Sequence, residues 1–376
     1  MPVPFIDLKR LEPGFLERWA EKCAELTETT QFVGGPEVTR LEERLRERTG
    51  AKAVVGCANG TDALQLALRA AGVGPGDEVL VPDATFWATF EAPVNVGARP
   101  VTVDIDPVDL QMDFDLFVKA AEECRPKAAI LVHLYGWGSG RLQDFRSFCR
   151  ERSITLVEDG AQGFGALHKG NSLFKEAQLA TLSFYPAKVL GSCGDAGAVF
   201  AESEELADIV RRLGNHGRTT HYGHGDVGWN SRMAGFDAGF LNLSLDYIDD
   251  RIEARRAVTH RYRGAFEEIG VPFAGPPDDY VENGYLSVAL PGLETRPALE
   301  VALREKGIGF GTVYPGAMSR QPGAKAWLAA RYGGENADRL CRGVINLPVF
   351  TGITDAEVEE CINVFAEAWH SAGTVR

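Results

Sequence analysis

The chain has 376 residues, of which 45% are hydrophobic and 24% charged, and its formal net charge is −14. A chain of this length can bury a large core, and two domains are the natural expectation. The acidic balance argues against a general nucleic-acid binder, because binding to a phosphate backbone needs clustered lysine and arginine. A local basic pocket for a small anion remains compatible with it.

The seven cysteines are irregularly spaced, and no C-x-x-C pair occurs among them. This pattern argues against a disulfide framework or a zinc site, and we expect no metal and reduced thiols in a cytoplasmic protein. No run of 18 apolar residues exists, so we expect no membrane span. The first residues, "MPVPFIDLKRLEPGF", carry no apolar core of a signal peptide.

Short apolar runs alternate with amphipathic stretches between about residues 40 and 200. The predicted strands are 51–58, 77–82, 99–106, 127–136, 154–162 and 179–186, and the predicted helices are 61–72, 113–125 and 142–153. This rhythm predicts βαβ units and an α/β fold with a mostly parallel sheet covered by helices on both faces. Such sheets bind ligands outside the carboxyl ends of their strands.

The pattern changes after about residue 240. A long amphipathic helical segment is predicted over 243–270, and further segments follow at 285–290, 298–310 and 355–373. We therefore predict a large domain over 1–245, including an N-terminal helical segment, and a smaller C-terminal α+β domain over 246–376.

The first candidate site stretch is "CANGTDALQLAL", in which Asn59, Gly60 and Thr61 lie between a predicted strand and a predicted helix. Free backbone N–H groups and the positive end of a helix make such a position suitable for an anion such as phosphate. The alternative is a simple strand-to-helix turn with an Asn or Thr cap.

The second stretch is "VPDATFWATF", where Phe86 and Trp87 follow the end of a predicted strand. An aromatic side chain at this place could stack on a flat ring. Packing into the core is the alternative for both residues.

The third stretch is "LVEDGAQGFGA". Glu158 and Asp159 end an apolar strand, and Gln162 follows. A carboxylate at the end of a buried strand needs a partner, and either a protonated ring nitrogen or a nearby arginine would serve. The alternative is that Asp159 caps the next turn.

The fourth stretch is "SFYPAKVLGSCGDAGAV", which begins at Ser183 and places Lys188 among apolar neighbours. Burial disfavours the ammonium form of a lysine and lowers its pKa, and the neutral amine is a nucleophile toward carbonyls. The alternative is that Lys188 extends to solvent.

Together the four stretches meet the needs of pyridoxal phosphate, which are a phosphate site, an aromatic plate, an acid for the ring nitrogen and a Schiff-base lysine. The chain resembles the sugar aminotransferase family, the DegT-like group of fold-type-I pyridoxal-phosphate enzymes. The resemblance covers nearly the whole length, from "VPFIDLKR" to "INLPVFTGIT". Its most specific segment is "SFYPAKVLGSCGDAGAV".

The resemblance implies a role for each matching residue. Lys188 forms the Schiff base with the cofactor and moves the substrate proton, and Asp159 keeps the pyridine nitrogen protonated. Gln162 reaches toward the phenolic oxygen of the ring. The remaining implied contacts are phosphate contacts from Gly60, Thr61 and Ser183, ring stacking by Phe86 and, across a homodimer interface, a phosphate contact from Asn230 of the other subunit.

The resemblance further implies transamination of a nucleotide-linked keto sugar, with L-glutamate as the amino donor, in the biosynthesis of amino sugars for surface polysaccharide, lipid A or glycosylated natural products. The stretch "HYGHGDVGWNSRMAGFDAGFL" favours a 3-keto sugar, and a 4-keto sugar is the alternative. A related class dehydrates sugars but replaces the lysine with histidine, so Lys188 favours transamination. A regulatory protein that binds the cofactor without turnover is the alternative from another functional class.

Overall fold

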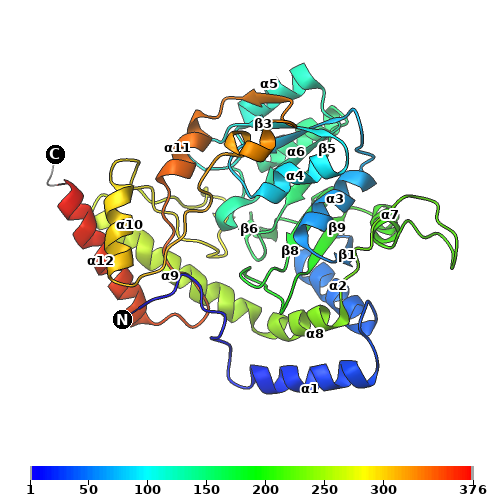
Figure 1. Ribbon diagram of the computed structural model, residues 1–376, viewed down its shortest axis with the longest axis horizontal. Coiled ribbons are helices and arrows are strands. Elements are labelled where there is room, and N and C mark those ends of the chain that lie inside the picture. Colours follow the sequence, from blue (N-terminus) through cyan, green and yellow to red (C-terminus); the bar gives the residue numbers. More distant parts are fainter. Residues whose placement is uncertain (1, 374–376) are drawn as a thin grey trace.

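The computed structural model describes residues 2–373 (Figure 1). The strands are β1 (Ala53–Cys57), β2 (Glu78–Pro82), β3 (Arg99–Val103), β4 (Ala128–Val132), β5 (Thr155–Asp159), β6 (Leu167–His168), β7 (Asn171–Ser172), β8 (Leu179–Ser183), β9 (Gly197–Ala201), β10 (Tyr280–Val281) and β11 (Ala330–Tyr332). The helices are α1 (Phe15–Glu28), α2 (Pro36–Thr49), α3 (Gly60–Ala70), α4 (Trp87–Asn95), α5 (Phe114–Cys124), α6 (Leu142–Glu151), α7 (Glu204–Gly214), α8 (Gly235–Ser244), α9 (Ile248–Glu268), α10 (Arg296–Glu305), α11 (Glu335–Gly343) and α12 (Asp355–Gly373). None of these helices is both long and apolar enough to cross a membrane.

A mostly parallel eight-stranded sheet forms the centre of the molecule, in the order β1-β9-β8-β5-β4-β2-β3-β11. Only β9 runs against its neighbours in this sheet, since it pairs antiparallel with both β1 and β8. The predicted α/β class is thus confirmed. The carboxyl ends of β5 and β8 lie side by side, because Asp159 pairs with Thr181 in parallel register.

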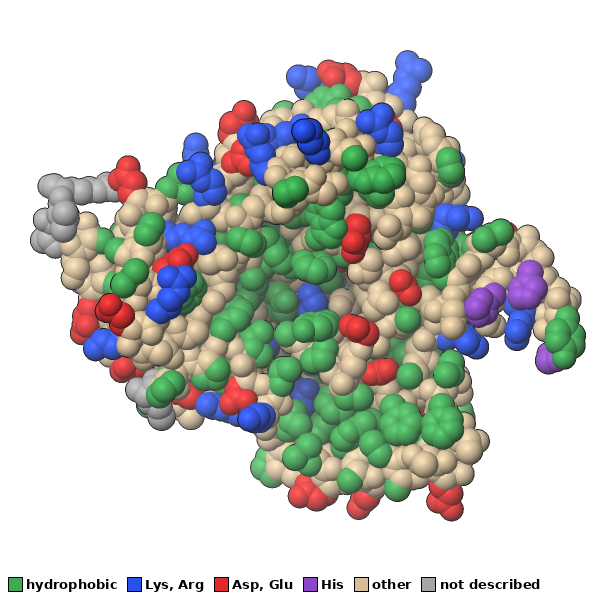
Figure 2. Space-filling model, viewed as in Figure 1, with side chains coloured by type: hydrophobic (Ala, Val, Ile, Leu, Met, Phe, Trp, Pro, Cys, Tyr) green, Lys and Arg blue, Asp and Glu red, His purple; other side chains and the backbone are tan. Residues whose placement is uncertain are grey.

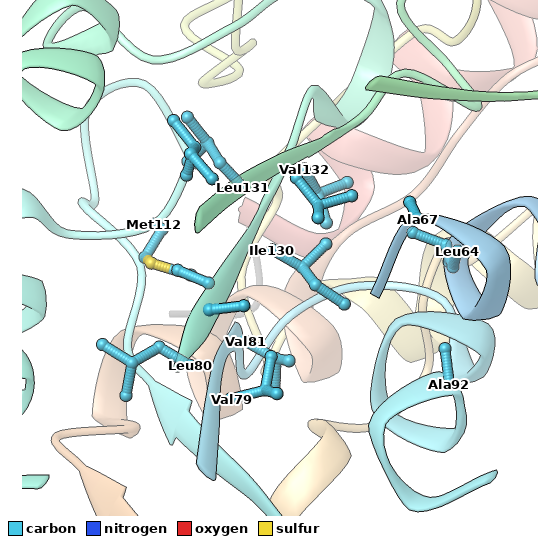
Figure 3. Close-up of a cluster of buried hydrophobic side chains, with 14 of the residues drawn as sticks. Leu64, Ala67, Val79, Leu80, Val81, Ala92, Met112, Ile130, Leu131 and Val132 are labelled. Atoms are coloured by element: carbon cyan, nitrogen blue, oxygen red, sulfur yellow. The ribbon is translucent and has the colours of Figure 1, made fainter. Parts of the chain in front are cut away.

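Helices cover both faces of this sheet because its strands are apolar on both faces. Every residue of β4 is buried. In Figure 3, Ile130 and Val132 point toward Leu64 of α3, whereas Leu131 points to the opposite side. Alternation of side chains along a strand requires this arrangement. Helix α3 packs against α4 and α7 on one face, and α5 contacts α6 on the other through aromatic rings.

A second, smaller core is formed by α9, α10 and α12 with the N-terminal segment. Val3 belongs to this core and bridges to Ile308. Conversely, β11 belongs to the C-terminal half of the sequence but pairs with β3 in the large sheet. The domain boundary near residue 245 stays a prediction, and these two segments cross it.

Glu158 is fully buried near the end of β5. Its carboxylate is neutralised by Arg146 and also contacts His133. Arg146 donates to its two carboxylate oxygens at 2.8 and 2.9 Å, and Nε2 of His133 lies 3.0 Å from Oε2. Burial raises the pKa of Glu158, but the charge of Arg146 and these hydrogen bonds outweigh burial, so its pKa is lowered. The pair fixes α6 to the strand that also carries Asp159.

We expect Arg146→Met to lower the free energy of unfolding by about 3–5 kcal/mol, because the substitution leaves a buried carboxylate without its cation. Urea unfolding measures this change. The matched control is Arg152→Met, which removes an ion pair to Glu122 whose two side chains are both 53% exposed, and it should cost no more than about 1 kcal/mol. Equal small losses in both variants would contradict a structural role for the buried pair.

Candidate active site

A pocket of about 770 Å³ opens beyond the carboxyl ends of β1, β5 and β8. Figure 2 shows this face of the molecule as a hollow lined mainly by apolar side chains, with blue lysine or arginine atoms at its floor. The predicted site residues that line the pocket are Gly60, Thr61, Phe86, Asp159, Gln162, Ser183 and Lys188. The structure therefore brings together residues that lie up to 128 positions apart in the sequence (60 to 188).

One end of the pocket is formed by the first turn of α3. Asn59 caps this helix, since its Oδ1 accepts a hydrogen bond from the backbone N–H of Asp62 at 2.7 Å. A Cβ on Gly60 would lie 2.6 Å from Cβ of Ser183, so the backbone approaches β8 too closely for a larger residue. Backbone N–H groups at a helix start, with a serine beside them, suit a phosphate group.

Asp159 lies deep in the pocket and has no cationic partner. It is 5% exposed, and its carboxylate accepts hydrogen bonds from the backbone N–H of Ala161 at 3.0 Å and from Oγ1 of Thr89 at 3.1 Å. The pKa of Asp159 is raised, because burial outweighs the opposing effects of the Ala161 N–H and of the charge of Lys188. Among residues 2–373 it forms no ion pair, so a protonated ring nitrogen fits this position.

Lys188 extends into the pocket. Its Nζ lies 3.4 Å from Oη of Tyr285 and 5.2 Å from the centre of that ring. The backbone N–H of Lys188 donates to the carbonyl of Tyr185 at 2.8 Å, in a turn just after β8. The turn presents the amine to the same space that Asp159 faces, which is where a nucleophilic amine would be useful.

Gln162 is held at both ends of its amide. Its Oε1 accepts from the backbone N–H of Tyr135 at 2.7 Å, and its Nε2 donates to Oη of Tyr314 at 2.9 Å. The Tyr314 ring also lies 5.6 Å from the ring of Phe86, which is 54% exposed at the start of α4. Trp87 instead stacks on Phe90 at 4.9 Å and does not line the pocket.

Asn230 lies away from this pocket. It is exposed and pairs with Asn215 at the base of the segment that follows α7, and this segment projects from the body of the molecule (Figure 1). Its side-chain oxygen accepts hydrogen bonds from Arg232 at 2.9 and 3.2 Å. The pocket of its own chain is thus built without it.

Sequence reasoning missed four residues of the site, namely Thr89, Arg255, Tyr285 and Tyr314. Thr89 reaches Asp159 from α4, and its place in "TFWATF" resembles any helical threonine. Tyr285 and Tyr314 come from the C-terminal part of the chain, 97 and 126 residues beyond Lys188. Tyr314, within "VYPG", carries only a weak sequence signal, and its contacts in the folded chain place it at the site.

Comparisons with known proteins identify related sequences and structures. A model of the DegT/DnrJ/EryC1/StrS aminotransferase family matches residues 16–366. The chain is 35% identical over 366 residues to UDP-2-acetamido-2-deoxy-3-oxo-D-glucuronate aminotransferase of Pseudomonas aeruginosa, covering 95% of this chain and 98% of that protein.

Two solved structures share the fold over nearly the whole chain. DesV of S. venezuelae, in complex with a ketimine intermediate, is 31% identical with a TM-score of 0.92, covering 98% of this chain and 99% of that one. NtdA of Bacillus subtilis, with bound cofactor PMP, is 25% identical with a TM-score of 0.88, covering 98% of this chain and 85% of that one.

We expect Gly60→Ala to weaken binding of pyridoxal phosphate by about tenfold or more, because the added methyl group must displace Ser183 and overpacking costs about 1–3 kcal/mol. Titration of the cofactor-free protein, followed by fluorescence quenching, measures the affinity. Gly74→Ala is the matched control, since a Cβ there meets nothing within 4 Å. Unchanged affinity in both variants would place the phosphate elsewhere.

Proposed function

The chain belongs to the DegT/DnrJ/EryC1/StrS aminotransferase family and is a pyridoxal-phosphate-dependent sugar aminotransferase, and on this premise we propose that it transfers an amino group from L-glutamate to a nucleotide-linked 3-keto sugar. The observation that carries the proposal is the amine of Lys188 in a pocket with the unpaired carboxylate of Asp159. The 3-keto position is supported by the name of the relative that is 35% identical over nearly the whole chain.

The proposed roles follow from the chemistry of each side chain. When bound, pyridoxal phosphate supplies a carbonyl that carries the amino group and a ring that accepts an electron pair. Lys188 would take the proton from the α-carbon of the donor and deliver it to the cofactor carbon that is bonded to the same nitrogen. Asp159 holds the proton of the ring nitrogen, because a buried carboxylate without another cation stabilises that positive charge.

The other proposed contacts position the cofactor. Gly60 and Thr61 offer the helix start, and Ser183 a hydroxyl, to the phosphate. Phe86 provides a face for the ring. The second amide hydrogen of Gln162 is free to donate to the phenolic oxygen, because Tyr135 and Tyr314 already fix the amide's orientation.

The product is an amino sugar, and we place the reaction in amino-sugar biosynthesis for surface polysaccharide, lipid A or natural-product glycosylation. We propose a cytoplasmic location, because all seven cysteines are free thiols in the structure and the cytoplasm keeps thiols reduced. A 4-keto sugar remains the second candidate substrate, because the same residues would serve either carbon.

Reaction in reverse tests the substrate. Nucleotide-linked 3-amino and 4-amino sugars are each supplied with 2-oxoglutarate, and L-glutamate formation is measured. We expect kcat/KM to be about 100-fold or more higher for the 3-amino sugar, because pocket contacts that differ by a hydrogen bond discriminate strongly. A preference for the 4-amino sugar would overturn the 3-keto assignment.

We expect Lys188→Ala to lower kcat by about 1,000-fold or more while the variant still binds the cofactor.

We also propose a homodimer in which Asn230 serves the partner's site. The residues near α1 and α8 leave apolar side chains exposed, among them Leu16 at 61%, Phe32 at 48% and Val33 at 56%. Figure 2 shows the corresponding apolar patch at the lower edge of the molecule. A second copy of the chain would cover such a surface, and Asn230 does not line the pocket of its own chain.

Mixing Asn230→Ala chains with Lys188→Ala chains tests the shared site. If Asn230 serves the partner, the mixed dimer has one site with both defects and one with neither, so activity should exceed the average of the two parents. Subunit exchange is checked separately with two affinity tags. Loss of one hydrogen bond to a charged acceptor costs only about 1.5–3 kcal/mol, so the Asn230→Ala parent keeps some activity. No excess after confirmed exchange would place Asn230 outside the partner's site.

A further inference from the structure

Arg255 on α9 is a buried cation without an acidic partner. It is 6% exposed, and its only hydrogen bond within residues 2–373 is from Nη1 to the carbonyl of Val349, at 2.6 Å. The other two buried arginines of the described chain are both paired with glutamates, Arg146 with Glu158 and Arg251 with Glu12. Arg255 is therefore the one buried arginine of the described chain without a carboxylate partner.

Leaving a guanidinium unpaired in the interior is costly for the folded protein. Burial lowers the pKa of Arg255 to about 10, so the group is still charged at neutral pH. Its Nε and Nη2 make no hydrogen bond to the described protein, so that side of the planar group is free for a two-point contact. A cost of this kind is offset when a ligand brings the missing anion.

The position of Arg255 indicates which molecule brings that anion. Arg255 lines the main pocket and also an adjoining cavity of about 400 Å³, and Lys188 lines both as well. The phosphate site proposed for the cofactor lies at the start of α3, which is a different wall of the pocket. Arg255 therefore faces the space of the substrates, in the two cavities that Lys188 also lines.

The charge balance favours a carboxylate over a diphosphate. One guanidinium neutralises one carboxylate, whereas a nucleotide diphosphate carries about two negative charges and usually gathers several donors. The other arginines that line the adjoining cavity are already paired, Arg10 with Glu357 and Arg251 with Glu12.

We propose that Arg255 binds a substrate carboxylate beside Lys188, supplied either by the amino donor or by a carboxyl group on the sugar. The inference deepens the proposed function and rests on it for the identity of the two substrates. Maleate represents the donor's dicarboxylate without reacting. A nucleotide-linked 3-amino hexuronate and the matching neutral 3-amino hexose, which differ only at C6, represent the sugar.

Calorimetric titration of the cofactor-loaded enzyme with these three ligands compares wild type with Arg255→Gln. Loss of a buried charge partner should weaken a carboxylated ligand by about 30-fold or more. Weakening of maleate alone assigns Arg255 to the donor, of the hexuronate alone to the sugar, and of both to a shared subsite. The matched control is Arg256→Gln on the same helix, where the side chain is paired with Glu253 and lines neither cavity. It should leave all three affinities within about twofold.

Three results would overturn the proposal. The first is unchanged affinity for both carboxylated ligands. The second is equal weakening of the neutral hexose and the hexuronate, which would assign Arg255 to the diphosphate. The third is failure of both carboxylated ligands to bind wild type. Arg255→Lys, which keeps the charge but not the planar fork, covers the case in which Arg255→Gln does not fold, and it should weaken the same ligand to a smaller extent. Because binding is measured without turnover, a wild-type enzyme that binds carboxylates through Arg255 but transaminates no sugar would refute the proposed function and leave this inference standing.

Discussion

Two adjacent carboxylates at the buried end of β5 have opposite electrostatic surroundings, and the site depends on this difference. Glu158 and Asp159 point to opposite faces of the sheet, as successive residues of a strand must. Glu158 is neutralised by Arg146, and its charge is thereby satisfied within the fold. Asp159 receives only a backbone N–H and the hydroxyl of Thr89, so its negative charge is left for a ligand.

The parallel sheet converts this local difference into a site. Because β5 and β8 are neighbours in parallel register, the turn after β8 brings Lys188 to the edge where β5 ends with Asp159. The start of α3 meets the same edge, where Gly60 lies too close to Ser183 for any side chain. An amine, a buried carboxylate and the start of a helix thus share one pocket.

Much of this could be predicted from the sequence because the relevant signals are local. A lysine within an apolar glycine-rich stretch and a carboxylate ending an apolar strand are visible in windows of about ten residues. The antiparallel β9 and the edge strand β11 were not predicted, since their pairing is set by long-range contacts. The roles of the individual residues at the site stay predictions, although the structure places seven of them around one pocket.

The lack of an acidic partner for Arg255 could not be predicted from the neighbouring sequence. The stretch "RIEARRAVTHRYR" carries five arginines on one helix, and amphipathic spacing alone cannot tell a paired arginine from an unpaired one. Glu12, which neutralises Arg251, comes from the other end of the chain, 239 residues away. No comparable acid reaches Arg255, and this absence within residues 2–373 emerges only from the folded chain.

A single pocket must serve both halves of a transamination, because donor and acceptor enter in turn and meet the same amine. Such a pocket needs features that suit two different molecules, and its mainly apolar walls offer few groups that could hold either one. Arg255, the cation that we propose binds a substrate carboxylate, meets part of this need because it lines the same pocket as Lys188. The overall charge of −14 adds to this effect, because a negatively charged ligand is repelled by the surface in general and attracted by a buried cation.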